Sequence, residues 1–233
     1  MLFRKIIKRI LYPNKYNSSA FTRYLKKRGC IVGEGTYFFA PKTTKIDVDN
    51  ACFITIGKYC KITSGVRILA HDYSYSVLRR VYHDIPKKAA LTTIGDNVFI
   101  GVDSIILNGS EIGDNVIIGA GSVVSGKIPS NEVWGGNPAK FICTLKDYYN
   151  KCKSKFENSA ELTVLQYQRR FNRNPSIQEL QWFSTLFLDN GQSEYEKMSF
   201  NGDNKQEVIK DALSKHKKYN TYEEFIEHVN RKD

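Results

Sequence analysis

Hydrophobic positions in the middle of the chain recur every six residues. From residue 94 onward each sixth position is aliphatic, and glycine follows it in most of the units. The aliphatic positions are Ile94, Ile100, Ile106, Ile112, Ile118 and Val124. Neither an α-helix nor a strand with one buried face produces this spacing. It is typical of a parallel β-helix, whose short strands build the three walls of a triangular coil of about 18 residues.

The fifth position of each unit is small or β-branched, so we expect it to fit beside the aliphatic side chain inside the prism. These positions are Val98, Ser104, Ser110, Val116, Ser122 and Ile128. The frame continues upstream with more noise, because Thr44 and Asn50 stand where aliphatic residues are expected. The upstream positions that keep the frame are Val32, Phe38, Ile56, Ile62 and Ile68.

Between Ile68 and Ile94 the spacing is not a multiple of six. An insertion is therefore predicted from about His71 to Leu91, and it is rich in tyrosine, arginine, lysine and aspartate. A loop of this length inside a compact repeat is usually functional. We therefore expect the chemistry of the protein in this loop.

The periodicity changes after the repeat. The segment from Trp134 to Lys140 contains two glycines and a proline, which predicts a turn that ends the coil. Ser176 with Glu179, and Thr221 with Glu224, have the spacing of capping boxes and predict helices. The predicted organisation is a basic amphipathic segment at residues 1–29, a β-helix at 30–145 with an inserted loop at 71–91, and a helical extension at 146–233.

The positive charge of the chain is concentrated near its N-terminus. The net charge is +11, and nine basic residues with no acidic one precede Glu34. Because the rest of the chain is nearly balanced, no nucleic-acid partner is expected. A helix predicted from Met1 to Leu11 has one apolar and one basic face. It either contacts a membrane surface through residues 1–12 or caps the open end of the prism.

The cysteines favour an intracellular protein. There are five, an odd number, and none are in a C-x-x-C motif, which argues against a disulfide framework and a structural zinc site. A reducing cytoplasm is the expected location, at the inner face of the membrane if the N-terminal helix binds lipid. The longest apolar stretch is too short for a signal peptide or a membrane-spanning helix.

The repeat resembles that of the hexapeptide-repeat acyltransferases, in particular the bacterial O-acetyltransferases that modify capsular and other exopolysaccharides. The resemblance covers about residues 30–143. It rests on four stretches: Ile94-Gly-Asp-Asn-Val-Phe-Ile-Gly, Ile118-Gly-Ala-Gly-Ser-Val-Val, Gly136-Asn-Pro-Ala-Lys and Ile68-Leu-Ala-His-Asp-Tyr. It implies that the coil is left-handed, an exception to the usual right-handed crossover. The fold class is thus mainly β, a left-handed parallel β-helix with helical segments at both ends.

The same resemblance implies a homotrimer. Acetyl-CoA, the acyl donor, would lie in a groove between neighbouring subunits and meet the acceptor at a histidine, which His71 matches. The implied donor contacts are Val102, Gly119, Ala120, Ser125 and, near the phosphates, Lys140.

Acetyl transfer from a thioester to a sugar hydroxyl needs a base, because an alcohol is a poor nucleophile at neutral pH. His71 suits this role, and the imidazolium can return the proton to the CoA thiolate without a covalent acyl-enzyme. The alternative is a corner residue with a satisfied hydrogen bond. Asp72 is the candidate for orienting the imidazole or binding the acceptor, although neighbours on an extended strand point to opposite sides.

Tyr73, Arg79 and His83 are the candidate acceptor-binding residues, because their loop can hold an anionic sugar by charge and stack on its ring. The loop is equally suited to contacting the next subunit. No metal is expected, since the three-histidine site of a zinc hydratase with this coil is hard to assemble from His83 and the histidines of the tail, His216 and His228.

Two other functions stay open at this stage. The chemistry could be the same with serine, a small sugar or an antibiotic as acceptor. Alternatively, the coil could be a catalytically silent scaffold with a membrane-binding N-terminus.

Overall fold

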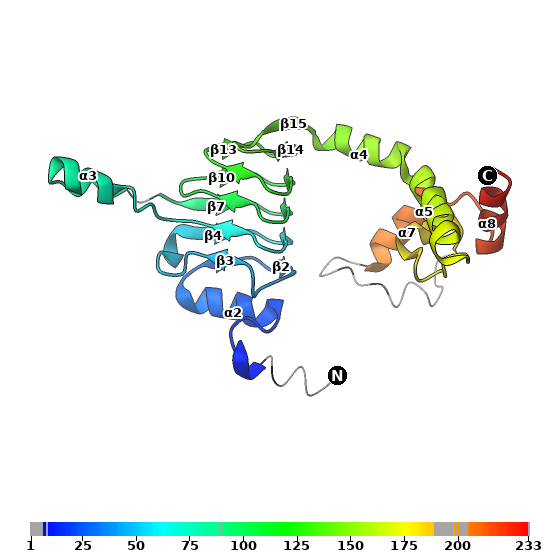
Figure 1. Cartoon of the computed structure of the whole chain (residues 1–233), viewed down its shortest axis with the longest axis horizontal. Coiled ribbons are helices and arrows are strands. Elements are labelled where there is room, and N and C mark those ends of the chain that lie inside the picture. Colours follow the sequence, from blue (N-terminus) through cyan, green and yellow to red (C-terminus); the bar gives the residue numbers. More distant parts are fainter. Residues whose placement is uncertain are drawn as a thin grey trace. The chain divides into compact units, whose positions relative to one another are not determined.

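The computed structural model describes residues 7, 9–88, 90–188, 198, 200 and 205–232. The chain divides into two compact units, Met1–Tyr148 and Tyr149–Asp233, each of which is described by itself. The first unit is a coil of short strands and the second is helical (Figure 1). Within the described part of the chain, no helix is both long and apolar enough to cross a membrane.

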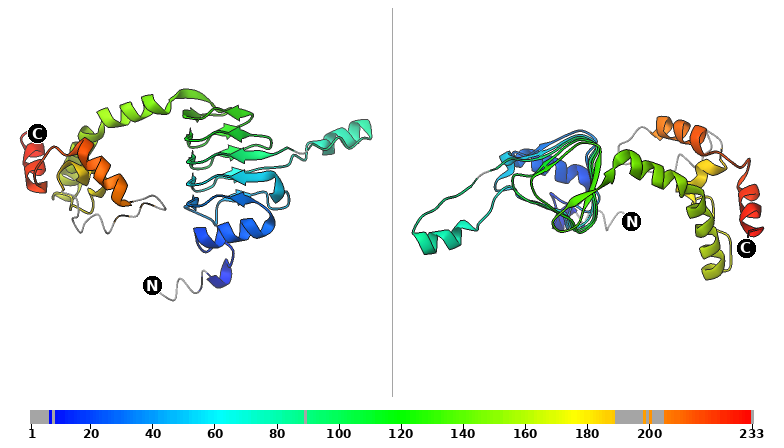
Figure 2. Two further views of the ribbon diagram at one scale, coloured as in Figure 1. Left: turned by 180° about the vertical axis from the view of Figure 1, so that it is seen from behind. Right: turned by 90° about the horizontal axis from the view of Figure 1, so that it is seen from above.

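Three walls of short strands form the coil, whose outline is triangular when it is seen from above (Figure 2). Wall A contains β1 (Ile31–Val32), β4 (Ile54–Ile56), β7 (Thr92–Ile94), β10 (Glu111–Ile112) and β13 (Lys127–Ile128). Wall B contains β2 (Tyr37–Phe38), β5 (Lys61–Ile62), β8 (Phe99–Ile100), β11 (Ile117–Ile118), β14 (Glu132–Gly135) and β15 (Lys140–Thr144). Wall C contains β3 (Lys45–Ile46), β6 (Arg67–Ile68), β9 (Ile105–Ile106) and β12 (Val123–Val124).

The fold is the predicted left-handed parallel β-helix, and its register explains the six-residue period. Ile94 pairs with Ile112, three repeat units further along the chain, and Ile100 pairs with Ile118 at the same spacing. Aliphatic residues of successive coils therefore stack inside the prism, where they are almost fully buried. Burial of these columns is the main source of stability of the coil.

Asparagines support the corner between walls A and B. Asn97, Asn115 and Asn131 occupy it on three successive coils with φ between 55° and 64°. Asparagine tolerates this left-handed conformation better than most residues do. The side chain of Asn97 donates to that of Asn115 at 2.9 Å, and Asn115 donates to Asn131 at 3.2 Å. The corner is thus held both by backbone conformation and by a ladder of amides.

The six-residue frame predicted from the sequence does not hold at either end of the coil. Ile128 pairs with Ile112 at a shorter separation than three full units, so it fills an aliphatic position rather than the small position predicted for it. The last coil is therefore shorter than the others. At the other end Ile46 pairs with Ile68 at a longer separation, because extra residues lie between β3 and β4. This insertion contains a 3-10 helix, η1 (Ala51–Phe53), and explains why Asn50 breaks the frame.

A helix covers the first coil. This helix, α2 (Ser18–Arg28), buries Phe21 and Leu25 in the same core as the aliphatic columns. The Phe21 ring packs edge-on against Phe38 at 5.0 Å between centroids. The helix predicted at residues 1–11 falls largely on residues 1–6 and 8, which lie outside the described part of the chain. Its membrane contact therefore stays a prediction.

The second unit has its own hydrophobic core. Its elements are α5 (Phe156–Phe171), η2 (Gln181–Leu186), α7 (Lys205–His216) and α8 (Tyr222–Asn230), while α4 (Leu145–Ser154) crosses the boundary between the units. Thr221 caps α8, accepting from the Glu224 amide at 3.1 Å. Ser176 and Glu179 form the predicted capping box, but a turn and the 3-10 helix η2 follow it instead of an α-helix.

Candidate active site

Two insertions into the coil lie at the same corner, which leads from wall C to wall A (the C–A corner). In the first coil, residues 47–53 separate β3 from β4, and in the second, residues 69–91 separate β6 from β7. Because β3 pairs directly with β6, the two insertions leave the coil one above the other. The longer one, which we call the arm, stands off from the coil and carries the helix α3 (Tyr75–Tyr82) (Figure 1).

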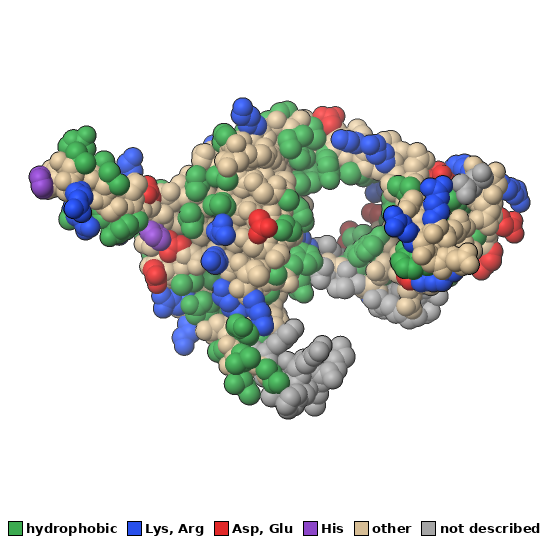
Figure 3. Space-filling model, in the orientation of Figure 1, with side chains coloured by type: hydrophobic (Ala, Val, Ile, Leu, Met, Phe, Trp, Pro, Cys, Tyr) green, Lys and Arg blue, Asp and Glu red, His purple; other side chains and the backbone are tan. Residues whose placement is uncertain are grey.

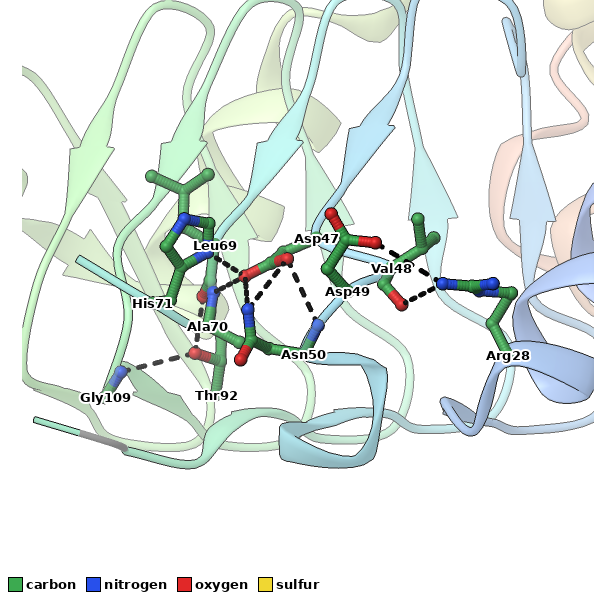
Figure 4. A network of polar contacts seen from close by, with 10 residues as sticks. All are labelled: Arg28, Asp47, Val48, Asp49, Asn50, Leu69, Ala70, His71, Thr92 and Gly109. Carbon is green, nitrogen blue, oxygen red and sulfur yellow. Dashed lines mark hydrogen bonds and ion pairs between the residues drawn. The ribbon is translucent and has the colours of Figure 1, made fainter. Parts of the chain in front are cut away.

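His71 lies at the root of the arm and points toward the shorter insertion (Figure 4). Its Nδ1 contacts Oδ2 of Asp47, which follows β3 on the neighbouring coil. The Asp47 side chain is only 4% exposed, whereas that of His71 is 45% exposed. The pair therefore has a buried carboxylate behind an accessible imidazole.

Asp47 is ionised, and both of its carboxylate oxygens accept hydrogen bonds. Its Oδ2 also accepts from the Ala70 amide at 3.3 Å, and Asn50 donates to both oxygens at 3.2–3.3 Å. Burial raises the pKa of Asp47, but the hydrogen bonds from His71, Asn50 and Ala70 outweigh burial and lower the pKa below its ordinary value. Asp47 therefore carries its charge throughout the neutral range.

The partner of the imidazole differs from the one expected. Asp72 turns away from His71, and its carboxylate accepts from the backbone amide of Ser74 at 2.7 Å and from the Ser74 hydroxyl at 2.8 Å. These bonds form a local turn at the start of the arm and lower the pKa of Asp72. The carboxylate that contacts the imidazole is therefore that of Asp47, not that of Asp72.

Asp47 was not predicted from the sequence, although the interrupted repeat indicates an irregular corner there. The separation of Asp47 and His71 along the chain differs from that of one regular coil, because the first coil is longer than the repeat requires. The broken frame at Asn50 marked the irregular corner. A polar residue in an irregular corner next to a histidine-bearing insertion is the feature that could have identified Asp47.

The predicted donor residues occupy two different edges of the coil. Val102, Gly119 and Ala120 lie at the corner between walls B and C, where the Gly121 amide bonds to the Val102 carbonyl at 2.7 Å. Val102 and Ala120 are not buried there. Ser125 follows β12 at the C–A corner. Within one chain, wall C separates the Val102 corner from His71.

Lys140, the remaining predicted donor contact, starts the last strand of wall B. It lies in β15, which runs antiparallel to β14, and it pairs with Gly135. Its side chain is exposed.

The predicted acceptor residues all lie on the arm. Tyr73 is exposed and packs against Tyr75 with 5.0 Å between ring centroids. Arg79 lies in the last turn of α3, and His83 ends the helix with a φ of 54°. No residue of α3 is buried, so apolar and basic side chains lie side by side on its surface (Figure 3). The arm brings the three residues to one element but holds them away from its own coil.

The ring of His71 is arranged for proton transfer. Its Nδ1 faces an ionised carboxylate and therefore carries the proton of the neutral imidazole, a tautomer that we assign from this contact. The lone pair is then on Nε2, which has no hydrogen-bond partner among the described residues. An exposed nitrogen base with a buried counter-charge can take a proton from a hydroxyl and stabilise the imidazolium that forms.

A group that could hold a metal lies in the second unit, not in the unit that carries His71. Glu157, Glu161 and His228 place their ligand atoms within 4.8 Å of one another. Lys218 pairs with Glu157 at 2.7 Å and Lys232 with Glu161 at 2.6 Å. The two carboxylates are therefore already neutralised by ammonium groups, as in an ordinary ion-pair network. We assign this group no part in the chemistry of His71.

Comparisons with known proteins identify the coil. The model of the family described as bacterial transferase hexapeptide (six repeats) matches residues 91–126. Protein CapG of Staphylococcus aureus is 38% identical over 175 residues, which are 72% of this chain and 90% of CapG. The mitochondrial gamma carbonic anhydrase 2 of Arabidopsis thaliana is 33% identical over 61% of this chain and 55% of its own length.

Among solved structures, a maltose O-acetyltransferase from Clostridium difficile 630 is similar to this chain, with 27% identity and a TM-score of 0.39. The alignment covers 54% of this chain and 75% of that structure. The match to the hexapeptide family and the extensive identity with CapG agree with the observed coil. The chain therefore belongs to the hexapeptide-repeat acyltransferase family, as its repeat predicts.

Proposed function

We propose that this protein is an acetyl-CoA-dependent O-acetyltransferase that transfers the acetyl group directly to a hydroxyl of a surface polysaccharide or its precursor. The observation that carries the proposal is the pair of His71 and Asp47 at the root of the arm. The pair offers a nitrogen base with a buried counter-charge, and the arm that begins at His71 carries exposed tyrosines and arginines. A base and a sugar-binding surface are the two parts that this reaction requires.

In the proposed reaction, Nε2 of His71 takes the proton of the acceptor hydroxyl as its oxygen attacks the thioester carbonyl. A tetrahedral oxyanion forms, and a backbone N–H is suited to stabilise it. The carbon–sulfur bond then breaks, and the imidazolium returns the proton to the departing CoA thiolate. Asp47 keeps Nδ1 protonated and stabilises the imidazolium between the two transfers.

The proposal includes a homotrimer with sites between subunits. His71 and the corner of Val102 and Ala120 lie on opposite edges of wall C, so one chain does not bring both to one place. A cyclic arrangement can set one edge of each subunit against the opposite edge of the next. The apolar residues that α3 leaves exposed, Val77 and Val81 among them, would then be covered by a neighbouring copy. The mass in solution, measured by light scattering, tests this assembly.

A thiol-release assay tests the reaction. Purified protein, acetyl-CoA and a panel of polysaccharides, oligosaccharides, free sugars and serine are incubated, and free CoA is measured with a thiol reagent. We expect release that depends on a saccharide acceptor, together with a gain of about 42 mass units on that acceptor, the mass of one acetyl group replacing a proton. Absence of release with every hydroxyl acceptor contradicts the proposal, and preference for serine or a free sugar shifts it to a small acceptor.

Replacement of Asp47 by Asn should lower kcat. The amide is nearly isosteric, but it no longer stabilises the imidazolium that forms during proton transfer and no longer fixes the tautomer. We expect kcat to fall by about tenfold to a hundredfold, a part of the usual contribution of general-base catalysis. Initial rates at saturating concentrations of both substrates measure the effect.

The control for this change is Asp49→Asn. Asp49 is 87% exposed and pairs with Arg28 rather than with the site. It should leave kcat at the wild-type level. An Asp47→Asn enzyme with the wild-type kcat would show that Asp47 does not assist the base.

Replacement of Arg79 and Arg80 by Ala should raise the KM for an anionic polysaccharide. Both lie in the exposed last turn of α3, where they can pair with acidic sugars. Loss of two such contacts is expected to raise the KM about tenfold and to leave the KM for acetyl-CoA unchanged. Steady-state kinetics with each substrate varied in turn measure the split.

The matched control is Lys26→Ala with Lys27→Ala, two adjacent basic residues in the last turn of α2. It removes the same charge from a helix that has no part in the proposed site. Equal effects of the two double substitutions would mean that the arm does not select the acceptor.

A further inference from the structure

The carboxylate of Asp47 accepts hydrogen bonds from Asn50 and Ala70 in addition to its contact with His71. Its Oδ1 accepts from the backbone amide and from the side-chain amide of Asn50, both at 3.3 Å. Its Oδ2 is shared by the Asn50 side chain at 3.2 Å, the Ala70 amide at 3.3 Å and the ring of His71. The Nδ2 group of Asn50 thus spans both oxygens and resists rotation of the carboxylate about its bond to Cβ.

Asn50 is itself held in place. It precedes η1, and its carbonyl accepts from the Phe53 amide at 3.0 Å. On the other side of the turn, Arg28 donates to the Val48 carbonyl at 3.2 Å, a backbone contact that does not depend on the side chain of Asp49 (Figure 4). The segment from Asp47 to Asn50 is therefore fastened to α2 at one end and to a helical turn at the other.

This segment exists only because the corner is longer than the repeat requires. Between β9 and β10 the same corner takes four residues, 107–110, while seven, 47–53, separate β3 from β4. The additional residues bring in Asn50. The corner between β9 and β10, with its four residues, has no position that corresponds to Asn50.

From these contacts we infer that Asn50 is a positioning residue for the active site: it fixes the plane of the Asp47 carboxylate so that Oδ2 faces Nδ1 of His71. The inference rests on the proposed function, because it assigns Asn50 a role in the same proton transfer. Asn50 acts through Asp47 and does not touch the imidazole. Precise placement of the group that supports a catalytic base is what such neighbouring contacts provide.

The test is Asn50→Ala, with Asn50→Asp as an isosteric second variant that removes the side-chain donor and adds a repelling charge. We expect kcat to fall about fivefold to tenfold with both KM values unchanged, since only the proton transfer is affected. Asp49→Ala, a neighbouring change that leaves the contacts of Asp47 in place, should leave kcat and both KM values at the wild-type level.

A second readout does not depend on activity. The proton on Nδ1 of His71, shared with Asp47, should give a far-downfield proton NMR signal that Asp47→Asn abolishes. In Asn50→Ala this signal should weaken or shift, while circular dichroism and the unfolding midpoint show a folded coil. Unchanged kcat and an unchanged signal in Asn50→Ala and Asn50→Asp would overturn the inference. Full activity of His71→Ala would instead refute the proposed function.

Discussion

Replacement of His71 by Ala is expected to reduce kcat for acetyl transfer by about a thousandfold, the middle of the range for loss of a general base. The hydroxyl of the acceptor then has no group to receive its proton, and the CoA thiolate has none to return it. Binding of acetyl-CoA should change little, because its expected contacts are made by other residues, Val102 and Ala120 among them. The release of free thiol at saturating acceptor measures kcat.

A histidine outside the coil provides the control for this experiment. His216 lies in α7 of the second unit, and its replacement by Asn should leave kcat at the wild-type level. His71→Ala should also keep the unfolding midpoint of the coil, since its ring is nearly half exposed. A His71→Ala enzyme with wild-type kcat would refute general-base catalysis by this residue.

Replacement of Gly57 by Ala is expected to destabilise the coil by about 3 kcal/mol, the upper part of the range for overpacking. A Cβ atom at Gly57 would lie 2.4 Å from the Gly95 carbonyl oxygen and 2.4 Å from Oδ1 of Asp96, on the next coil. The Gly57 amide bonds to the Ile94 carbonyl at 2.8 Å, so the two coils cannot separate without breaking the wall. The backbone must therefore give way.

Urea unfolding followed by the fluorescence of Trp134 measures this loss, in a Trp182→Phe background so that only the coil is observed. Gly126→Ala is the matched control. Gly126 has no atom within 4 Å of the new Cβ, although its φ of 76° disfavours any side chain. It should cost about 1 kcal/mol from backbone strain alone. Equal losses in the two variants would show that spacing between coils is not what requires glycine at position 57.

The sequence predicts the coil well because its walls obey one rule. In each wall, a strand pairs in register with the strand of the next coil. An inward aliphatic residue must therefore recur at a constant spacing in the sequence, as in the pairs of Ile94 with Ile112 and of Ile100 with Ile118. The insertion before Thr92 is visible for the same reason, as an interval that the rule does not allow. Handedness came from the family resemblance, because period alone does not set it.

The active site is predicted only in part, because corners obey no such rule. His71 could be singled out by its place at the start of the insertion. Asp47 follows from no spacing rule, since its distance from His71 in the sequence depends on how many residues the corner of the first coil contains. Only the broken frame at Asn50 marks that corner. Asp72 is adjacent in sequence, but it serves a local turn with Ser74. Adjacency in the sequence therefore predicts the partner of His71 less well than adjacency between successive coils does.

The placement of both insertions at one corner has a consequence for how enzymes on this scaffold diversify. Residues 47–53 and 69–91 do not interrupt strand pairing, because each insertion begins after one strand ends and finishes before the next strand begins. The arm can therefore be lengthened, shortened or exchanged as a cassette while the walls keep their hydrogen bonds. On the proposed function, the root of the arm carries the base His71, whereas the rest of the arm carries the acceptor contacts. An exchanged arm would then change acceptor preference and leave the base in place.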